Sequence, residues 1–578
     1  MTKKTAWVLG VMVLVLMISA WVAVFGVYML LRPGRIEVEQ NSVLEIDLEN
    51  QLPELPATST VAQILRADAI NIMDLGLILR EASRDQRISS VYLRVHSPVG
   101  NWAQVEEIRD YLKAFRKSNK KVYAHLALDM PDESQLYLVS PADEIYLNPD
   151  AGLQINGLVA EIEFYKKMMD KLKVEPQFLQ FKEFKSPETW SRENMTPEFR
   201  AMLESVLGDI QNRFVQTVAQ ERHIEASRLR ELLNLGIAPA GLAVQERLVT
   251  ALGYRDEVQS RLMVDKRGGG KEYRSITASK YLKVLQSRSG GKPKHRLALV
   301  GGLGPIVAGT GDETWEQVMG GETLAARLRE IRKEKDIKGV LFRIDSPGGS
   351  AVGSDKVWRE IRLLEREGKP VVVSMAGVAG SGGYYIAMGA RKIVAQPSTI
   401  TGSIGVIFGK FNLKGLFEHW LGITTDKVKL AENADIFSST SSLSEAQKEQ
   451  IRRWMQEIYN NFVRKAAEGR GLTFEDLESK AHGRIYTGAQ AKQLKLIDEV
   501  GGVSTAIEVL KKELKIPDSE NVELVLYPKP KSLSQSFLEG DLFKGSISRP
   551  SLDAFWQQTI RTLETPGPWL LTPDLKIR

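Results

Sequence analysis

The chain has 578 residues, of which 43% are hydrophobic and 26% are charged, a balance typical of a folded globular protein with about two to four domains. The 78 Lys and Arg residues exceed the 72 Asp and Glu residues by only 6 charges, so composition gives no reason to expect a nucleic-acid partner. Cysteine is absent, which excludes thiol nucleophiles, zinc-thiolate sites and iron-sulfur clusters and is compatible with an oxidising compartment.

The N-terminal segment predicts a membrane anchor. No charged residue occurs from Ala6 to Leu31, and basic residues flank this run on both sides. As a helix rising about 1.5 Å per residue, the run would cross a hydrocarbon core of about 30 Å, and it is longer than the roughly 7 to 15 apolar residues of a cleaved signal peptide. We therefore expect a retained single-pass anchor, although the flanking charges do not set its orientation.

The remainder of the chain is duplicated. Residues 87–100 (RISSVYLRVHSPVG) align with residues 336–349 (DIKGVLFRIDSPGG), and residues 142–157 align with residues 390–405 without a gap. Between these segments each copy has the pattern of an amphipathic helix, a turn and a further buried strand. Alternation of strands and helices predicts an α/β fold with parallel strands in each copy.

This duplication divides the chain into five parts. Two glycine-rich stretches, beginning at Asp265 and Ser287, are typical of linkers and separate the copies. The predicted parts are an anchor (1–35), an N-terminal α/β repeat (36–264), a linker (265–296), a C-terminal α/β repeat (297–525) and a tail (526–578).

Three glycine-rich turns occur in the second copy, at residues 345–350, 376–385 and 401–405, and each follows an apolar run. In α/β proteins such turns gather at one edge of the sheet, where ligands bind. A Gly-Gly pair lacks Cβ atoms, so its main-chain N–H groups can approach a ligand and form an oxyanion hole. Because the first copy lacks these turns, we expect a site restricted to the second copy.

Ser403, in the turn Gly-Ser-Ile-Gly, is a candidate nucleophile that needs a base to accept its proton. None of the six histidines lies in a glycine-rich turn of the second copy; they are His96, His125, His223, His295, His419 and His482. A lysine can replace histidine where burial lowers its pKa toward neutrality.

Lys185 fits this requirement, because three phenylalanines surround it in the sequence, Phe178, Phe181 and Phe184. It lies 30 residues after Ile155, which aligns with Ser403, and the same step from Ser403 reaches Asn433. One copy thus has the lysine and the other has the serine, which predicts a single composite site across the two repeats. The alternative is that Lys182 and Lys185 are ordinary surface lysines.

The sequence resembles the tandem-repeat form of the signal peptide peptidase A, or protease IV, family over nearly its whole length. The segments that carry the resemblance are RIDSPGGS, MAGVAGSGGYYIA, STITGSIG and FKSPETW. The resemblance implies two Clp-protease/crotonase-like repeats after one transmembrane helix. It also implies a serine endopeptidase with a Ser/Lys dyad that degrades released signal peptides and forms a ring-shaped homo-oligomer, a tetramer.

Transferred by position, the resemblance makes Ser403 the nucleophile, Lys185 the general base, and Gly348 and Gly349 the oxyanion hole. It implies no metal and no other cofactor. The expected partners are hydrophobic peptides and the membrane, with the catalytic part on the periplasmic side of the inner membrane. A further hydroxyl often orients the lysine of such a dyad, and the candidates are Thr425, Ser438 and Ser439.

Three other functions are compatible with parts of this pattern. A crotonase-like acyl-CoA enzyme would use the same Gly-Gly turn without a seryl nucleophile, and a noncatalytic membrane scaffold would need no serine at all. Nucleotide binding is the weakest alternative, because no turn matches GxxxxGK[ST].

Overall fold

The structure is a computed structural model that describes residues 36–56, 69–185, 187–265, 269–288, 294–311 and 318–529 and the backbone of residues 567–571. The predicted anchor at residues 6–31 lies outside these ranges. Among the helices inside them, none combines the length and the apolar character needed to cross a membrane.

The N-terminal half is built on a six-stranded sheet in which all neighbouring strands are parallel. In sheet order its strands are β11 (Ser275–Thr277), β1 (Ser42–Leu48), β2 (Ile88–Val95), β3 (Lys121–Leu126), β4 (Glu144–Leu147) and β8 (Ala251–Leu252). Nearly every residue of β1 and β2 is buried, as expected for a parallel sheet covered on both faces.

The C-terminal half is built on an eight-stranded sheet that is parallel except where β19 meets β21. Its main path is β21 (Ile485–Thr487), β19 (Ile400–Gly402), β17 (Val371–Gly380), β15 (Ile337–Ser346), β12 (His295–Leu303) and β23 (Val522–Tyr527). Two further strands, β18 (Lys392–Ala395) and β22 (Glu499–Val500), extend it from β17.

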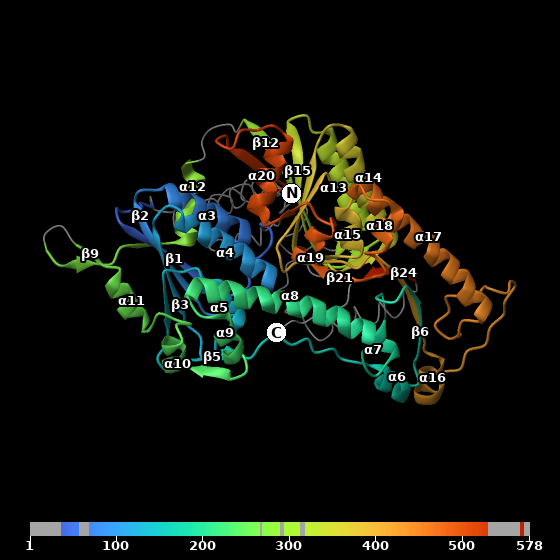
Figure 1. Cartoon of the computed structure of the whole chain (residues 1–578). Helices are drawn as coiled ribbons and strands as arrows, with labels where there is room; N and C mark the ends of the chain where they lie inside the picture. The colour runs from blue at the N-terminus through green and yellow to red at the C-terminus, as the bar shows by residue number, and fades with distance from the viewer. Residues whose placement is uncertain are drawn as a thin grey trace, which may run out of the picture.

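Helices pack around both sheets (Figure 1). In the N-terminal half they are α3 (Ile72–Arg84), α4 (Trp102–Arg116), α5 (Glu133–Val139), α6 (Lys166–Leu172), α7 (Glu188–Ser191), α8 (Pro197–Arg222), α9 (Ala226–Leu232), α10 (Ala240–Gln245), α11 (Arg255–Arg261) and α12 (Ala278–Arg288). In the C-terminal half they are α13 (Gly321–Lys333), α14 (Ala351–Arg366), α15 (Gly382–Ala387), α16 (Lys414–Leu416), the π-helix η1 (Phe417–Leu421), α17 (Glu445–Arg470), α18 (Phe474–Glu478), α19 (Gly488–Gln493) and α20 (Val503–Glu513).

The order of elements repeats along the chain, as the self-comparison of the sequence predicts. The series α3, β2, α4, β3, α5 in the first half corresponds to α13, β15, α14, β17, α15 in the second. The long helices α8 and α17 correspond as well, and a capping box between Ser444 and Gln447 is present at the start of α17.

Residues 269–288, inside the stretch 265–296 that was expected to be a linker, form secondary structure. β9 (Val264–Asp265) pairs with β10 (Lys271–Glu272). Strand β11, which pairs with β1, and helix α12 follow in the chain. Ile276 and Tyr281 are buried in the N-terminal core, so this stretch completes the first sheet instead of only joining the repeats.

A third sheet joins the two halves. Its order is β14 (Met319–Gly320), β13 (Ile306–Val307), β16 (Gly348–Ser350), β24 (Gly567–Leu571), β20 (Val406–Asn412) and β6 (Glu175–Phe181). β6 belongs to the N-terminal half of the chain, yet it pairs antiparallel with β20 over seven residue pairs. Figure 1 shows β6 beside α16 and α17 of the C-terminal half. The remaining short strands, β5 (Gly152–Ile155) and β7 (Gly236–Pro239), pair with each other.

A buried charge cluster also links the halves. The Arg343 guanidinium on β15 donates to the carboxylates of Glu54, at 2.5 Å, and Glu107, at 2.8 Å. Arg343 and Glu107 are each 1% exposed in their side chains. Both carboxylates come from the N-terminal half, so this arginine holds the second sheet against the first repeat.

Replacing Arg343 by methionine should lower the free energy of unfolding by about 3 to 5 kcal/mol, because two carboxylates would remain buried without their cation. The equivalent change at Arg296, whose ion pairs with Asp336 and Glu523 are more exposed, should cost less than about 1 kcal/mol. Urea denaturation of both variants would measure the difference. Equal losses in the two variants would contradict a special role for the buried cluster.

Candidate active site

The antiparallel ladder between β6 and β20 positions the candidate residues. Phe181 at the end of β6 lies opposite Val406 at the start of β20. Lys185 follows β6 by four residues, and Ser403 precedes β20 by three residues. The ladder therefore brings the lysine of the first repeat to the serine of the second.

Lys185 contacts two serine hydroxyls. Its Nζ lies 2.7 Å from Ser403 Oγ and 2.7 Å from Ser381 Oγ, and it donates to the Ser403 carbonyl oxygen at 2.9 Å. Lys185 is 2% exposed, and both serines are fully buried. Three groups with acid-base or nucleophilic chemistry thus meet in a site closed to bulk water.

Burial lowers the pKa of Lys185 well below its ordinary value, because the charged ammonium loses its hydration. The backbone packs closely around this side chain: a Cβ atom at Gly483 would lie 2.4 Å from the Lys185 Cβ, and one at Gly405 would lie 3.1 Å from it. A neutral amine beside two hydroxyls can accept a proton from either one.

The lowered pKa of Lys185 predicts how stability depends on pH. Between the lowered pKa and the unfolded value of about 10.4, the unfolded chain binds one more proton than the folded chain, so stability rises with pH across this window. Lys185→Met removes this contribution. Unfolding midpoints in urea from pH 6 to 9.5 should show the native protein gaining stability relative to Lys185→Met as pH rises, and a gap that stays constant would contradict a depressed pKa.

Both serines have unusual backbone conformations. Ser381 has φ +53° and Ser403 has φ +52°, in a region that costs a non-glycine residue about 1 to 3 kcal/mol. Hydrogen bonds hold these conformations: Ser381 N–H donates to the Gly402 carbonyl at 2.8 Å, and Ser403 N–H donates to the Arg484 carbonyl at 2.7 Å. Each hydroxyl is therefore fixed relative to the lysine by its own main chain.

The glycine turn of β16 lies beside Ser381. Gly348 and Gly349 have φ +106° and +147°, which require glycine. A Cβ atom at Gly382, the residue after Ser381, would lie 3.1 Å from the Gly349 nitrogen. The N–H of Gly348 donates to Ser346 Oγ at 3.2 Å. The turn that was predicted to form an oxyanion hole is therefore adjacent to Ser381.

Ser403 has different neighbours. Its flanking glycines, Gly402 and Gly405, face the segment from Gly483 to Tyr486 and the stem of Lys185. Ser403 therefore lies on the side of the lysine where this segment packs, whereas Ser381 is adjacent to the β16 turn.

Sequence analysis did not identify Ser381, although it lies inside the glycine-rich turn at residues 376–385. One sequence signal could have identified it. Ser381 lies directly before helix α15, and the first copy has Asp132 at the corresponding position before helix α5, so the two copies differ here as they do at Ser403. The candidate hydroxyls Thr425, Ser438 and Ser439 are not among the hydrogen-bond partners that the described residues provide to Lys185; Ser438 Oγ accepts from Lys427 at 2.9 Å.

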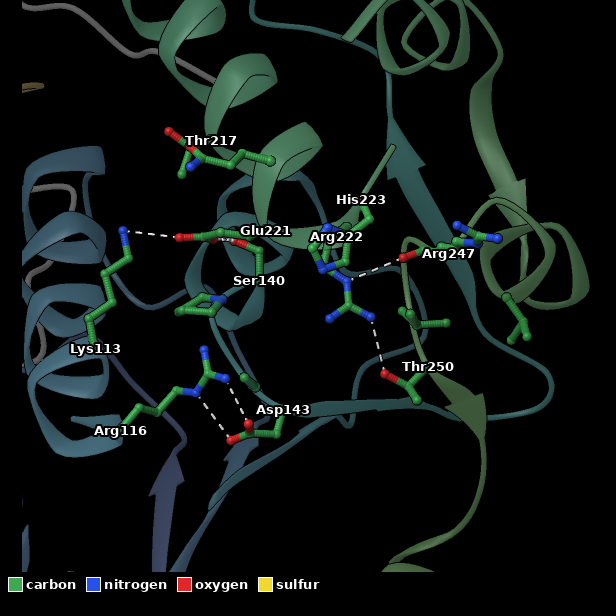
Figure 2. A pocket seen from close by; sticks show the side chains of 15 residues that line it. Lys113, Arg116, Ser140, Asp143, Thr217, Glu221, Arg222, His223, Arg247 and Thr250 are labelled. Carbon is green, nitrogen blue, oxygen red and sulfur yellow. Dashed lines mark hydrogen bonds and ion pairs between the residues drawn. The ribbon is translucent and has the colours of Figure 1, made fainter. Parts of the chain in front are cut away.

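An open cavity of about 810 Å³ lies elsewhere, in the first repeat, and shares no lining residue with this site (Figure 2). Two ion pairs lie on its walls. Arg116 bonds Asp143 at 2.7 Å, and Lys113 approaches Glu221 to 3.0 Å. Figure 2 shows these pairs on the walls, and the lysine that lines the cavity, Lys113, is 44% exposed in its side chain, unlike the buried Lys185.

Comparison with known proteins reveals clear similarity. The model of peptidase family S49 matches residues 114–268 and 364–517, together more than half of the chain and one match in each half. The chain is 32% identical to "Serine protease SPPA, chloroplastic" of Arabidopsis thaliana over 512 residues, covering 87% of this chain and 74% of that protein. It is 32% identical to "Protease 4" of Haemophilus influenzae over 459 residues, covering 76% of this chain and 72% of that protein.

"Protease 4" of Salmonella typhi is 31% identical over 450 residues, which covers 76% of this chain and 71% of that protein. Among solved structures, a ClpP1 mutant from Listeria monocytogenes matches 37% of this chain and 94% of its own, with 15% identity and a TM-score of 0.24. That TM-score is too low to decide the fold.

Proposed function

Because the chain belongs to peptidase family S49 and is a serine-type peptidase, we propose that it is an endopeptidase whose Ser/Lys site is assembled from both repeats. The observation that carries the proposal is the position of Lys185 Nζ, 2.7 Å from two buried serine hydroxyls of the other repeat. A Clp-protease/crotonase-like fold for each repeat is part of this proposal.

Two serines can deliver the attacking oxygen, and their surroundings favour Ser381. A peptide carbonyl needs a nucleophile and oxyanion donors on the same reacting carbon. Ser381 adjoins the β16 turn through Gly382, whereas the flanking glycines of Ser403 face the segment after His482. We assign attack to Ser381 and the orientation of the lysine to Ser403. The sequence-based assignment of Ser403 as nucleophile stays a competing prediction.

The proposed reaction begins when neutral Lys185 accepts the proton of Ser381 Oγ as this oxygen bonds to the substrate carbonyl carbon. N–H groups of the β16 turn, which include that of Gly349, stabilise the oxyanion. The ammonium then donates its proton to the leaving amine as the peptide bond breaks, leaving an acyl-serine. Water, deprotonated by Lys185, hydrolyses this ester and restores the serine hydroxyl. No step requires a metal or a cofactor.

The proposed substrates are hydrophobic peptides such as released signal peptides. Complete burial of the site favours an unfolded segment over a folded protein. The apolar run from Ala6 to Leu31 supports a single-pass anchor that would hold the enzyme where such peptides leave the bilayer. We also propose that the catalytic part lies on the periplasmic side of the inner membrane and that the protein forms a tetrameric ring. Both proposals follow from the family resemblance alone.

A serine-directed fluorophosphonate probe tests the chemistry directly. The full-length protein should be labelled on a single serine, which peptide mass spectrometry locates, and should cleave a synthetic apolar signal peptide but not a folded protein of similar length. A scaffold or an acyl-CoA enzyme predicts neither labelling nor cleavage. Absence of both, in protein with a cooperative unfolding transition, would refute the proposal.

A further inference from the structure

The pairing of β15 with β17 is interrupted opposite Asp345. Ile344 of β15 pairs with Met375 of β17. The next pair on this ladder is Ser346 with Ala379, so β17 places three residues, 376–378, opposite the single residue between these pairs on β15. These three residues form a bulge, the β17 bulge, and a bulge bends its strand and redirects the side chains that follow it.

The β17 bulge leads directly to Ser381. From Val378 to Gly380 the strand pairs with β19, and Ser381 is the next residue. The N–H of Ser381 then donates to the Gly402 carbonyl of β19 at 2.8 Å. The conformation of the bulge therefore determines where the Ser381 hydroxyl lies relative to Lys185.

Two side chains bind the main-chain groups of the β17 bulge. Asp345 Oδ1 accepts the N–H of Val378 at 2.8 Å. Thr399 Oγ1, from the segment before β19, donates to the Ala376 carbonyl at 2.7 Å. Because main-chain groups inside a sheet need hydrogen-bond partners, the carboxylate takes the place that a carbonyl of the neighbouring strand has in a regular ladder.

The first repeat is built differently at this point. His96 occupies the position that corresponds to Asp345, and its Nε2 lies 3.4 Å from Asp47 Oδ1. Asp132 occupies the position that corresponds to Ser381. The carboxylate that accepts from the bulge thus occurs in the repeat that has the serine.

We propose that Asp345 is a positioning residue whose carboxylate holds the β17 bulge and thereby places the Ser381 hydroxyl against Lys185. This inference rests on the proposed peptidase function. Asp345 also lies three residues before Gly348 in the chain. One side chain therefore connects the segment that leads to the oxyanion turn with the segment that leads to the nucleophile. Its loss should slow the chemical step and leave peptide binding intact, because the alignment of reacting groups acts on the barrier.

Two substitutions of Asp345 in the full-length chain test the proposal. Asp345→Leu removes the acceptor at similar volume, whereas Asp345→Asn keeps an acceptor oxygen and removes the charge. We expect kcat of Asp345→Leu for an apolar peptide to fall on the order of 100-fold with KM within about threefold of the native value. Asp345→Asn should restore kcat to within about fivefold of the native value. The rate of fluorophosphonate labelling should follow kcat.

Asp143→Leu is the matched control from the first repeat. Asp143 Oδ2 accepts the N–H of Val122 on β3 at 2.8 Å, so this change removes the same kind of bond at the same distance. We expect Asp143→Leu to retain the native kcat and KM. A loss of kcat equal to that of Asp345→Leu would overturn the proposal, because it would show a general effect of removing such a bond.

Hydrogen exchange of the Val378 amide reports the bond without activity. This amide should exchange about tenfold faster or more in Asp345→Leu than in Asp345→Asn. Unchanged exchange would overturn the proposal, and so would faster exchange with kcat near the native value. If the native protein neither cleaves peptides nor reacts with the probe, the peptidase proposal fails, and exchange still shows whether Asp345 holds the bulge.

Thr399→Val is a second test that keeps every charge at the site. It removes the hydroxyl that binds the Ala376 carbonyl and preserves the shape of the side chain. We expect kcat to fall about tenfold with KM within about threefold of the native value. If Asp345→Leu lacks a cooperative unfolding transition, this variant decides, and a native kcat in Thr399→Val would then overturn the role of the bulge.

Discussion

Replacing Ser381 by alanine will abolish peptide cleavage, with a loss in kcat/KM on the order of 10⁴-fold or more, as for the nucleophile of other serine hydrolases. The hydroxyl lies 2.7 Å from Lys185 Nζ and beside the β16 glycine turn, so its removal leaves a base without a nucleophile. Cleavage of a fluorogenic apolar peptide measures the loss, and fluorophosphonate labelling should disappear with it.

Ser403→Ala is the matched comparison, because this hydroxyl has the same distance to the lysine and the same burial. We expect a smaller loss, about 10- to 100-fold, with labelling of Ser381 retained, since the lysine keeps its bond to Ser381 and to the Ser403 carbonyl. The opposite pattern, with labelling lost only in Ser403→Ala, would show that the sequence-based choice of nucleophile is right and our assignment is wrong.

The second large effect is expected from Lys185→Met, which keeps most of the side-chain volume and removes the amine. Cleavage should fall on the order of 10⁴-fold, because Lys185 is the base within hydrogen-bond distance of both serines among the residues that the structure describes. Lys185→Arg should be equally inactive, because a guanidinium stays protonated and cannot accept the serine proton. Initial rates at several pH values measure both losses.

Lys182→Met is the control from the same segment. Lys182 Nζ pairs with Glu478 at 2.7 Å, and its side chain is 29% exposed, so its loss should change kcat/KM by no more than a fewfold. A cooperative unfolding transition in each Met variant would exclude a folding defect. Substantial cleavage by Lys185→Met would refute the lysine as general base.

Some of this architecture could be predicted because it is local or repeated in the sequence. Strand and helix periodicity gave the order of elements, and alignment of the copies placed Lys185 and Ser403 at complementary positions. The two residues lie 2.7 Å apart between the nitrogen and the hydroxyl oxygen. Their catalytic roles remain predictions, because distance alone does not assign a nucleophile.

Other features depend on contacts that a single sequence does not reveal. Ser381 has the same short-range pattern as an ordinary glycine-serine turn, and only its neighbours, Lys185 and the β16 turn, distinguish it. β6 and β20 are far apart in the chain and are not joined by a hairpin turn, so no local sequence signal predicts that they pair. The glycines of residues 265–296 predict a linker, whereas Ile276 and Tyr281 within this range are buried in the N-terminal core and β11 pairs with β1 of the first sheet.

The seven-pair ladder between β6 and β20 has a consequence for biosynthesis. A ribosome makes β6 and Lys185 long before it makes β20, so a nascent chain holds its lysine without a partner strand and without either serine. The amine would then stay hydrated and protonated until the second half emerges and docks. Hydrolytic capability would therefore arise late, when most of the polypeptide has been synthesised.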